Sequence, residues 1–300
     1  MRVWDGRSML LAAASLAACG GSTLVGADAG SSVDAAAPEA AAASDGEAFT
    51  ADAAEEQRLA TDAAEAALPS ARVDFETSPG YGFFFAQFAS ALRSPECAVL
   101  AEQPACEVYR CPPPDDGGAT RSAGTLTIAG GFLDGSVQVE PGADGMYMWN
   151  TPYAGDDLFA PGQAMTVRAS GAQVPAFGPE SIVGPAPLAL TAPMLPSDGG
   201  RYALSTSQDL IVGWTGGSPG DRVMVQASGF DSSFAQVMAE CYFDASAQQG
   251  TVPHAAMAYL QGLSQGVLIW GAVHGRIFAA GDASVRLSAT NYDYAWVTLQ

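Results

Sequence analysis

The sequence contains no lysine, so its 12 basic residues are all arginines, and they face 32 acidic residues. The resulting net charge of −20 repels phosphates and anionic lipid head groups, which argues against a nucleic acid as partner. Such a charge favours divalent cations or basic partners, although a solvated acidic surface explains the same composition without any ligand.

The apolar run near the N-terminus is too short to cross a bilayer. Met9–Ala18 holds ten uncharged residues that would span ~15 Å as a helix, about half of a ~30 Å hydrocarbon core. Arg2 and Arg7 precede this run, small residues end it, and Cys19 follows at once. This order is typical of a signal peptide, which we expect to comprise residues 1–18.

Leu16-Ala17-Ala18-Cys19 resembles the lipobox of bacterial lipoproteins. The resemblance implies that Cys19 becomes the lipidated first residue of the mature chain, anchored to a membrane through several acyl chains such as palmitate. Gly20 stands where an inner-membrane retention signal would show Asp, so the resemblance implies the outer membrane or cell surface. An ordinary signal peptide cut near Ala18 would instead leave a free thiol. The whole chain is also similar to uncharacterised secreted lipoproteins of myxobacterium-type genomes, which implies no activity.

Cysteine is scarce, and the count is informative. Besides Cys19 the chain has Cys97, Cys106, Cys111 and Cys241, and an even number in an exported protein predicts two disulfide bonds. Four cysteines allow three pairings, among which the sequence does not choose, but each pairing joins Cys241 to the 97–111 cluster. The spacing has no C-x₂-C pair and no nearby histidine, which argues against zinc.

Residues 19–69 have the composition of a largely disordered tether. Between positions 20 and 68 there are ten acidic side chains, the single basic residue Arg58 and few residues able to form a core. Self-repulsion and missing apolar surface keep such chains unpacked. Thr50 as N-cap and Pro69 after the last apolar residue predict an exposed, fraying helix over Ala51–Leu68.

From about residue 70 the hydrophobic pattern changes to period two, with Gly, Pro and Asp clusters between short segments. This pattern predicts an all-β fold of two β-sandwich modules, 70–186 and 187–300. The proline-rich stretch 175–187 lies between them, since proline is excluded from central strands. We expect strands at 73–77, 124–128, 136–140, 146–149, 164–169, 187–191, 209–214, 222–227, 236–243, 267–273, 284–288 and 295–299.

The second module resembles a fibronectin-III or immunoglobulin-like domain. The resemblance rests on strand spacing and on Trp214, which ends a strand before a Gly/Pro-rich turn and a Val-x-Val strand. It departs from that pattern at 251–260, where Pro253 and an Ala/Met/Leu run predict one short helix.

One motif suggests catalysis. Gly262-Leu-Ser264-Gln-Gly266 matches G-x-S-x-G, but the hydrolase elbow needs a strand before the serine and a helix after it, whereas the order here is reversed. His274 and Asp282 also follow in an order that those hydrolases do not use. His254 and His274 are the only imidazoles and lack a clear third partner for a metal. We therefore predict no catalytic residue and no enzyme.

Two further features suggest binding. Acidic glycine-rich loops recur at 115–118, 144–145, 155–157 and 197–200, and their carboxylates are a calcium-binding alternative. No D-x-D-x-D-G loop is present, however, and turn chemistry alone explains Asp-Gly pairs. The aromatic run Tyr81–Phe88 places Phe83 and Phe85 on one strand face and Phe84 on the other. We expect it to pack in a core; a stacking platform for sugars or a hydrophobic partner is the alternative.

The sequence thus predicts a membrane-anchored envelope lipoprotein that acts as a non-catalytic binding or structural module without a cofactor. Its partner is unidentified and is expected to be an envelope glycan or another protein. A calcium-supported surface adhesin or glycan-binding protein is the alternative, and a serine hydrolase using Ser264 is a remote one.

Intact-mass analysis of the membrane fraction, with and without reduction, tests the anchor and the cysteine arithmetic together. We expect a chain that begins at Cys19, carries the added mass of its acyl groups and gains about 4 Da on reduction, two hydrogens per disulfide. A bare thiol at Cys19, or a disulfide that includes it, would contradict both assignments.

Overall fold

A computed structural model describes residues 71–89, 97–112, 120–151, 157–196, 200–218 and 220–300. These ranges are mostly β-strand, with one short helix, so the predicted all-β fold is confirmed. The signal peptide, Cys19, the tether and its predicted helix lie outside the described residues.

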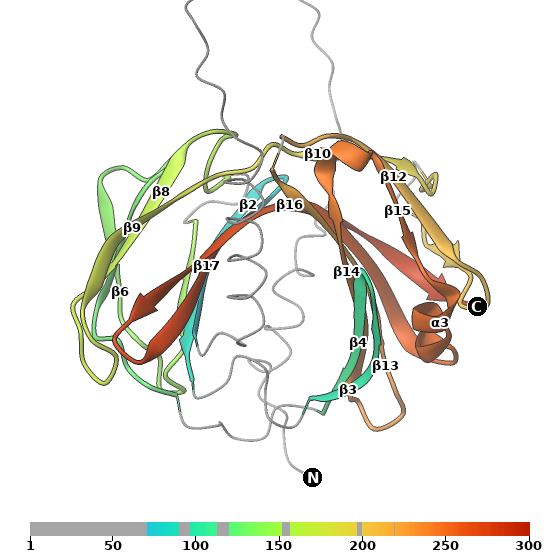
Figure 1. The fold of residues 1–300 in the computed structure, drawn as a ribbon, viewed down its shortest axis with the longest axis horizontal. Coiled ribbons are helices and arrows are strands. Elements are labelled where there is room, and N and C mark those ends of the chain that lie inside the picture. The colour runs from blue at the N-terminus through green and yellow to red at the C-terminus, as the bar shows by residue number, and fades with distance from the viewer. Residues whose placement is uncertain (1–70, 90–96, 113–119, 152–156, 197–199, 219) are drawn as a thin grey trace, which may run out of the picture. The chain divides into compact units, whose positions relative to one another are not determined.

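The strands form three sheets (Figure 1). The largest has the order β3 (Ala98–Gln103), β4 (Cys106–Cys111), β14 (Gln236–Asp244), β13 (Arg222–Phe230), β16 (Ser264–Ala280), β17 (Ala283–Leu299), β1 (Ala71–Ser78), β2 (Tyr81–Phe88) and β7 (Tyr147–Asn150), with β11 (Tyr202–Leu204) also paired to β17. A four-stranded sheet has the order β6 (Ser136–Val139), β5 (Leu126–Gly130), β8 (Ala164–Ala169) and β9 (Phe177–Val183). A three-stranded sheet has the order β10 (Leu188–Ala192), β12 (Leu210–Gly216) and β15 (Gln249–Val252).

Two hydrophobic cores lie between these sheets. The first joins β1, β2 and β7 to the four-stranded sheet, with Phe75, Phe84 and Leu126 among its buried residues. The second joins β13 and β14 to the three-stranded sheet and the short helix, with Trp214 and Met257 among its buried residues. Each core therefore has a sandwich arrangement, with the ten-stranded sheet as the shared layer.

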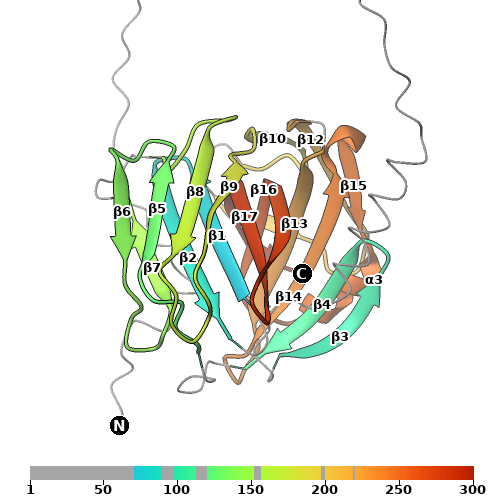
Figure 2. The ribbon, with the colours of Figure 1, turned by 60° about the vertical axis from the view of Figure 1, so that its left-hand side comes forward.

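The hairpin of β16 and β17 contributes residues to both cores. Its two strands lie in the middle of the ten-stranded sheet (Figure 2). Its closed end contributes Ala280, Val285 and Leu287 to the first core, and its open end contributes Leu268 and Val297 to the second. Along the other edge of β17, β1 pairs in parallel at residues 285–291 and β11 pairs in parallel at residues 297–299.

The strand order does not follow the sequence boundary at residue 187. Strands β1, β2, β3, β4 and β7 come from the predicted first module, yet they share one sheet with β13, β14, β16 and β17 from the second. The pairing of β1 with β17 and that of β4 with β14 cross the boundary. The expected modules 70–186 and 187–300 are thus not separate in this sheet, although two cores exist.

Several local predictions are corrected by the structure. The strands expected at 284–288 and 295–299 are one continuous strand, β17, because its two halves pack into different cores. Strands β3, β4, β9, β11 and β15 (Gln249–Val252) were not expected. Strand β9 contains Pro179, which is tolerated because β9 lies at an edge of its sheet.

The expected short helix is present. Pro253 is the N-cap of α3 (His254–Met257), and a 3₁₀ turn, η2 (Ala258–Leu260), continues it. Ala256, Met257 and Leu260 bury their side chains in the second core, which explains why an Ala/Met/Leu run forms a helix here.

Both predicted disulfides are formed, as Cys97–Cys111 and Cys106–Cys241. Cys106 lies directly opposite Cys241 in the antiparallel pairing of β4 with β14. Cys97 directly precedes β3, and Cys111 ends β4. The two bonds therefore fasten the β3–β4 hairpin to itself and to the rest of the large sheet.

The two disulfides differ in the length of chain that they close. Sequence separations of 135 and 14 residues predict contributions of about 5 and about 3 kcal/mol in the chain-entropy model. We expect the double variant C106A/C241A to lose more unfolding free energy than C97A/C111A, measured by urea titration. Equal losses, or the reverse order, would contradict this account of the hairpin.

Candidate functional site

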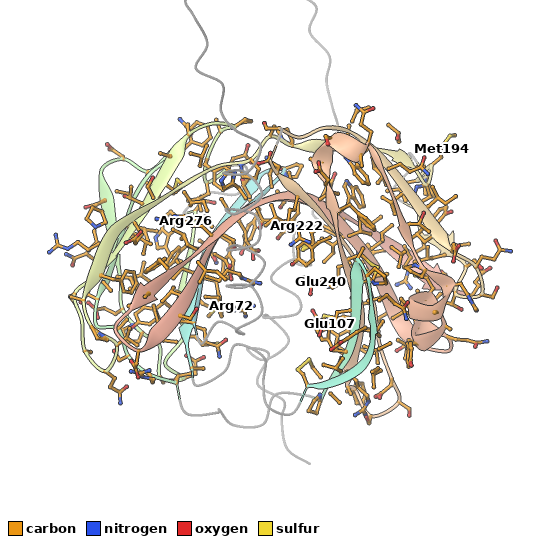
Figure 3. The ribbon with its side chains drawn as sticks, viewed as in Figure 1. Arg72, Glu107, Met194, Arg222, Glu240 and Arg276 are labelled. Carbon is orange, nitrogen blue, oxygen red and sulfur yellow. A yellow bond between two sulfur atoms is a disulfide. The ribbon has the colours of Figure 1, made fainter. Side chains whose placement is uncertain are left out.

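One face of the ten-stranded sheet lies opposite both cores, and we call it the polar face. On β1, Val73 and Phe75 point into the first core, so alternation puts Arg72, Asp74 and Glu76 on the polar face. The same alternation gives Arg286 and Ser288 on β17, Arg222 on β13, Glu240 and Tyr242 on β14, and Glu107 and Tyr109 on β4. In Figure 3 the side chains of Arg72, Arg222, Glu240 and Glu107 extend from the same side of the sheet.

The aromatic run of β2 is divided between the two faces, as alternation predicted. Phe84 and Phe88 lie in the first core. Phe83 stacks between Tyr81 and Phe85 on the polar face, with ring centroids 6.3 Å apart in both pairs. Phe83 and Phe85 are only 8% and 3% exposed, so these two rings do not form the exposed stacking platform considered from the sequence.

Three glutamates form a row across the edge of the sheet. The antiparallel registers place Glu102 of β3 opposite Glu107 of β4, and Glu107 opposite Glu240 of β14. Like charges directly opposite each other destabilise a sheet. The row therefore has an electrostatic cost that other interactions must offset.

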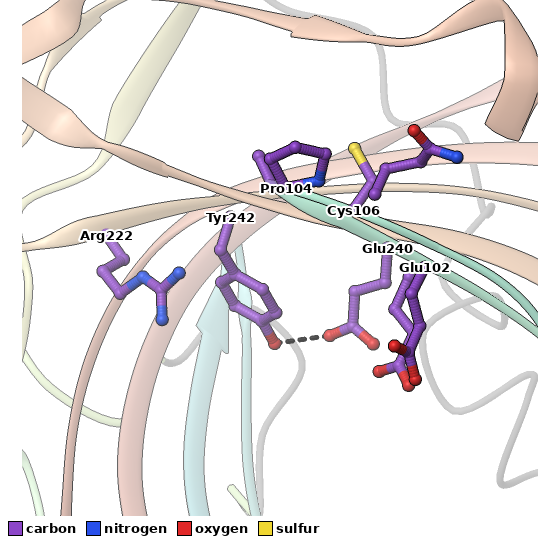
Figure 4. Close-up of a pocket in the computed structure, with 9 residues that line it drawn as sticks. Glu102, Pro104, Cys106, Arg222, Glu240 and Tyr242 are labelled. Atoms are coloured by element: carbon purple, nitrogen blue, oxygen red, sulfur yellow. Dashed lines mark hydrogen bonds between the residues drawn. The ribbon is translucent and has the colours of Figure 1, made fainter. Parts of the chain in front are cut away.

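A pocket of about 290 Å³ lies over this row (Figure 4). We call it the edge pocket. It is lined by Glu102, Gln103, Pro104, Ala105, Cys106, Glu107, Arg222, Glu240 and Tyr242. The β3–β4 turn forms one wall, and the Cys106–Cys241 disulfide fixes that wall to β14.

Tyrosine hydroxyls hold the carboxylate of Glu240. Tyr109 donates to its Oε2 and Tyr242 donates to its Oε1. Burial, together with the adjacent charge of Glu240, raises the pKa of Tyr242, so its phenol stays protonated and remains a donor. The Arg222 guanidinium lies 4.8 Å from the centroid of the Tyr242 ring. The pocket thus presents fixed acceptors, a cation and an aromatic ring.

A second charged group lies on β1 and β17. Ser288 donates its hydroxyl to Asp74 Oδ1 at 2.5 Å, and Asp74 Oδ2 lies 3.7 Å from Arg72 Nε. Burial opposes the charge of Arg286, but the carboxylates of Asp74 and Glu240 and nearby tyrosines outweigh it and raise its pKa. Arg286 therefore remains charged on the polar face.

The residues of the G-x-S-x-G motif and the histidines do not come together. Ser264 and His274 lie ten residues apart on β16, which is roughly 33 Å in an extended strand. Ser264 donates to the Phe230 carbonyl, and His274 Nδ1 lies 3.2 Å from Asp221 Oδ1. Asp282 forms an ion pair with Arg121 at 3.0 Å.

His254 also has a structural position, because it is the first residue of α3 and its backbone N–H donates to Asp209. Two of the acidic loops have described aspartates, and both accept backbone hydrogen bonds. Asp144 accepts from the Met146 N–H within its own turn, and Asp157 accepts from the Gly80 N–H of the β1–β2 turn. Within the described ranges no group of three or more His, Cys, Asp or Glu side chains is arranged to hold a metal ion. The aspartates at 115–116, 156 and 198 lie outside these ranges.

Comparison with known proteins does not assign a function to this site. Neither a scan against protein-family models nor a search of curated proteins found a match. In the part of the chain that the structure describes, no helix has the length and hydropathy needed to cross a membrane.

Sequence reasoning missed the edge pocket and the charged group on β1 and β17. The alternation of Arg72, Asp74 and Glu76 with apolar residues gave a local signal that they share one face. Nothing local indicates that Glu240 lies beside Glu107, because that contact depends on the register between strands distant in the sequence.

Glu76 provides a pH test of the polar face. Burial, and then the charge of Asp74, raise its pKa from 4.5 to about 7. The folded state therefore holds this proton to a higher pH than the unfolded state, and its stability falls as the pH rises from about 4.5 to about 7.

We expect Glu76→Gln to remove this loss and to raise the unfolding free energy at pH 8 by on the order of 1–2 kcal/mol, with little effect at pH 4. Urea titrations of the variant and the wild-type protein across this pH range measure the difference in unfolding free energy. Glu140→Gln, at an exposed position after β6, is the matched control. Destabilisation by Glu76→Gln at pH 8 would show that the charged form is favoured in the fold.

Proposed function

We propose that the protein is a lipid-anchored envelope protein that acts as a non-catalytic binding module, and that a glycan of the envelope binds in the edge pocket. The observation that supports this most is the lining of the pocket, where Glu102, Glu107, Glu240, Arg222 and Tyr242 surround one open space. Sugar hydroxyls donate to carboxylates and accept from guanidinium groups, and sugar C–H faces pack on aromatic rings.

The volume of the pocket limits the size of the ligand that it can bind. Its volume of about 290 Å³ is near the lower end of small-molecule pockets, roughly 300–1,000 Å³. A terminal sugar residue fits this space, whereas a long buried chain does not. The two disulfides hold the β3–β4 wall in place, which lowers the entropic cost of binding.

The anchor and the tether fit this role. Cys19 would hold the chain at the membrane, and residues 20–68 would reach ~38 Å as coil, which keeps a binding domain clear of the surface. A non-catalytic role is supported by the separation of Ser264 from His274 along β16.

A glycan microarray probed with the full-length protein tests this function. We expect binding to a subset of glycans, and we expect Glu240→Gln to weaken it about 10- to 100-fold, because one hydrogen bond to a charged group contributes about 1.5–3 kcal/mol. Arg222→Ala, at an exposed residue that lines the pocket, should also weaken binding, while Glu140→Gln should not.

Circular dichroism of each variant separates lost binding from lost folding. Absence of binding to every glycan, or binding that survives both Glu240→Gln and Arg222→Ala in folded protein, would contradict the proposal. In that case a protein partner becomes the better candidate.

A further inference from the structure

Two arginines on the polar face have donors that the described structure does not satisfy. Arg72 of β1 and Arg286 of β17 are direct register partners in the parallel pairing of these strands. Their Nε atoms are both buried, and neither has a hydrogen-bond partner in the described part of the chain. These residues are different from those that line the edge pocket.

The nearby carboxylate does not satisfy these donors. Asp74 accepts the Ser288 hydroxyl at 2.5 Å, and its other oxygen lies 3.7 Å from Arg72 Nε, which is too long for a hydrogen bond. A buried donor left without a partner costs about 1–3 kcal/mol, and more when the group is charged. Like charges opposite each other in neighbouring strands add to that cost.

Both arginines are half-buried on the polar face, and their Nε atoms belong to the buried part. The Arg72 side chain is 35% exposed, and its guanidinium lies 4.4 Å from the centroid of the Phe85 ring, which supports it from one side. Arg286 interacts electrostatically with Asp74, Tyr242, Glu240 and Tyr109. Its strand, β17, lies in the sheet between β1 and β16, and β16 pairs with β13, which carries Arg222 of the edge pocket.

We infer that Arg72 and Arg286 together bind an oxyanion, a phosphate or carboxylate group that is either free or a substituent of a glycan. Guanidinium groups match such oxygens in a bidentate geometry. An oxyanion that inserts between the two side chains would give both buried Nε donors an acceptor and would lie between the two like charges. The net charge of −20 opposes non-specific attraction of anions. Binding at this pair would therefore be specific.

Nuclear magnetic resonance of the arginine Nε–H groups in the full-length protein tests this inference on the atoms concerned. We expect added sodium phosphate to shift the Arg72 and Arg286 signals, while sodium chloride at equal ionic strength does not. Arg72→Lys and Arg286→Lys keep the charge but remove Nε, and each should abolish the response at the remaining arginine. Arg168→Lys, at an exposed position on β8, is the matched control.

Glucose 6-phosphate and glucose distinguish the two sources of the anion. A response to glucose 6-phosphate that exceeds the response to inorganic phosphate supports a glycan substituent, and the opposite order supports a free anion. No shift with either phosphate compound, an equal shift with chloride, or a response that survives both lysine variants would overturn the inference. Because these probes do not require the edge pocket, failure here would leave the glycan proposal standing.

Discussion

The pairing of β17 with its neighbours is the constraint on which the rest of the structure depends. One edge of β17 pairs along its length with β16, and the other edge pairs in parallel with β1 and with β11. Leu287 on this strand lies in the first core and Val297 lies in the second. Each core therefore depends on its own half of the hairpin, and the two halves belong to the same continuous strands.

The same pairing determines the polar face. Side chains alternate along a strand, so a slip of one residue between β1 and β17 would exchange Arg72 and Asp74 for Val73 and Phe75. The hydrophobic residues of the first core therefore fix the positions of the charged ones. At the far edge of the sheet, the Cys106–Cys241 disulfide adds a covalent restraint on the register of β4 with β14, and with it on the glutamate row.

Local patterns predicted much of the fold, and long-range pairing was the part that they could not predict. The strand expected at 164–169 matches β8, and Pro253 marks the start of the short helix. The sequence of β3 shows little alternation, and β4 alternates over only a few residues, with Cys106 and Val108 buried, so neither segment stood out from the loops around it. The parallel pairing of β1 with β17 joins residues more than two hundred positions apart, so no local sequence pattern predicts it.

The candidate site depends on this long-range pairing for its assembly. Glu102 and Glu107 come from one hairpin, but Glu240 and Arg222 reach the same pocket only through the pairing of β14 with β4 and β13. Arg72 and Arg286 meet only through β1 and β17. A binding function placed on this face is thus a property of the assembled sheet and not of either half of the chain.

The cooperativity of unfolding tests most directly whether the two cores share one sheet. Urea-dependent hydrogen exchange can follow β5, which belongs to the first core, and β12, which belongs to the second. Because β17 serves both cores, we expect the two strands to lose protection in one transition with a common midpoint. Two separate midpoints would show that the chain consists of independent modules, and would contradict the shared sheet on which the site is built.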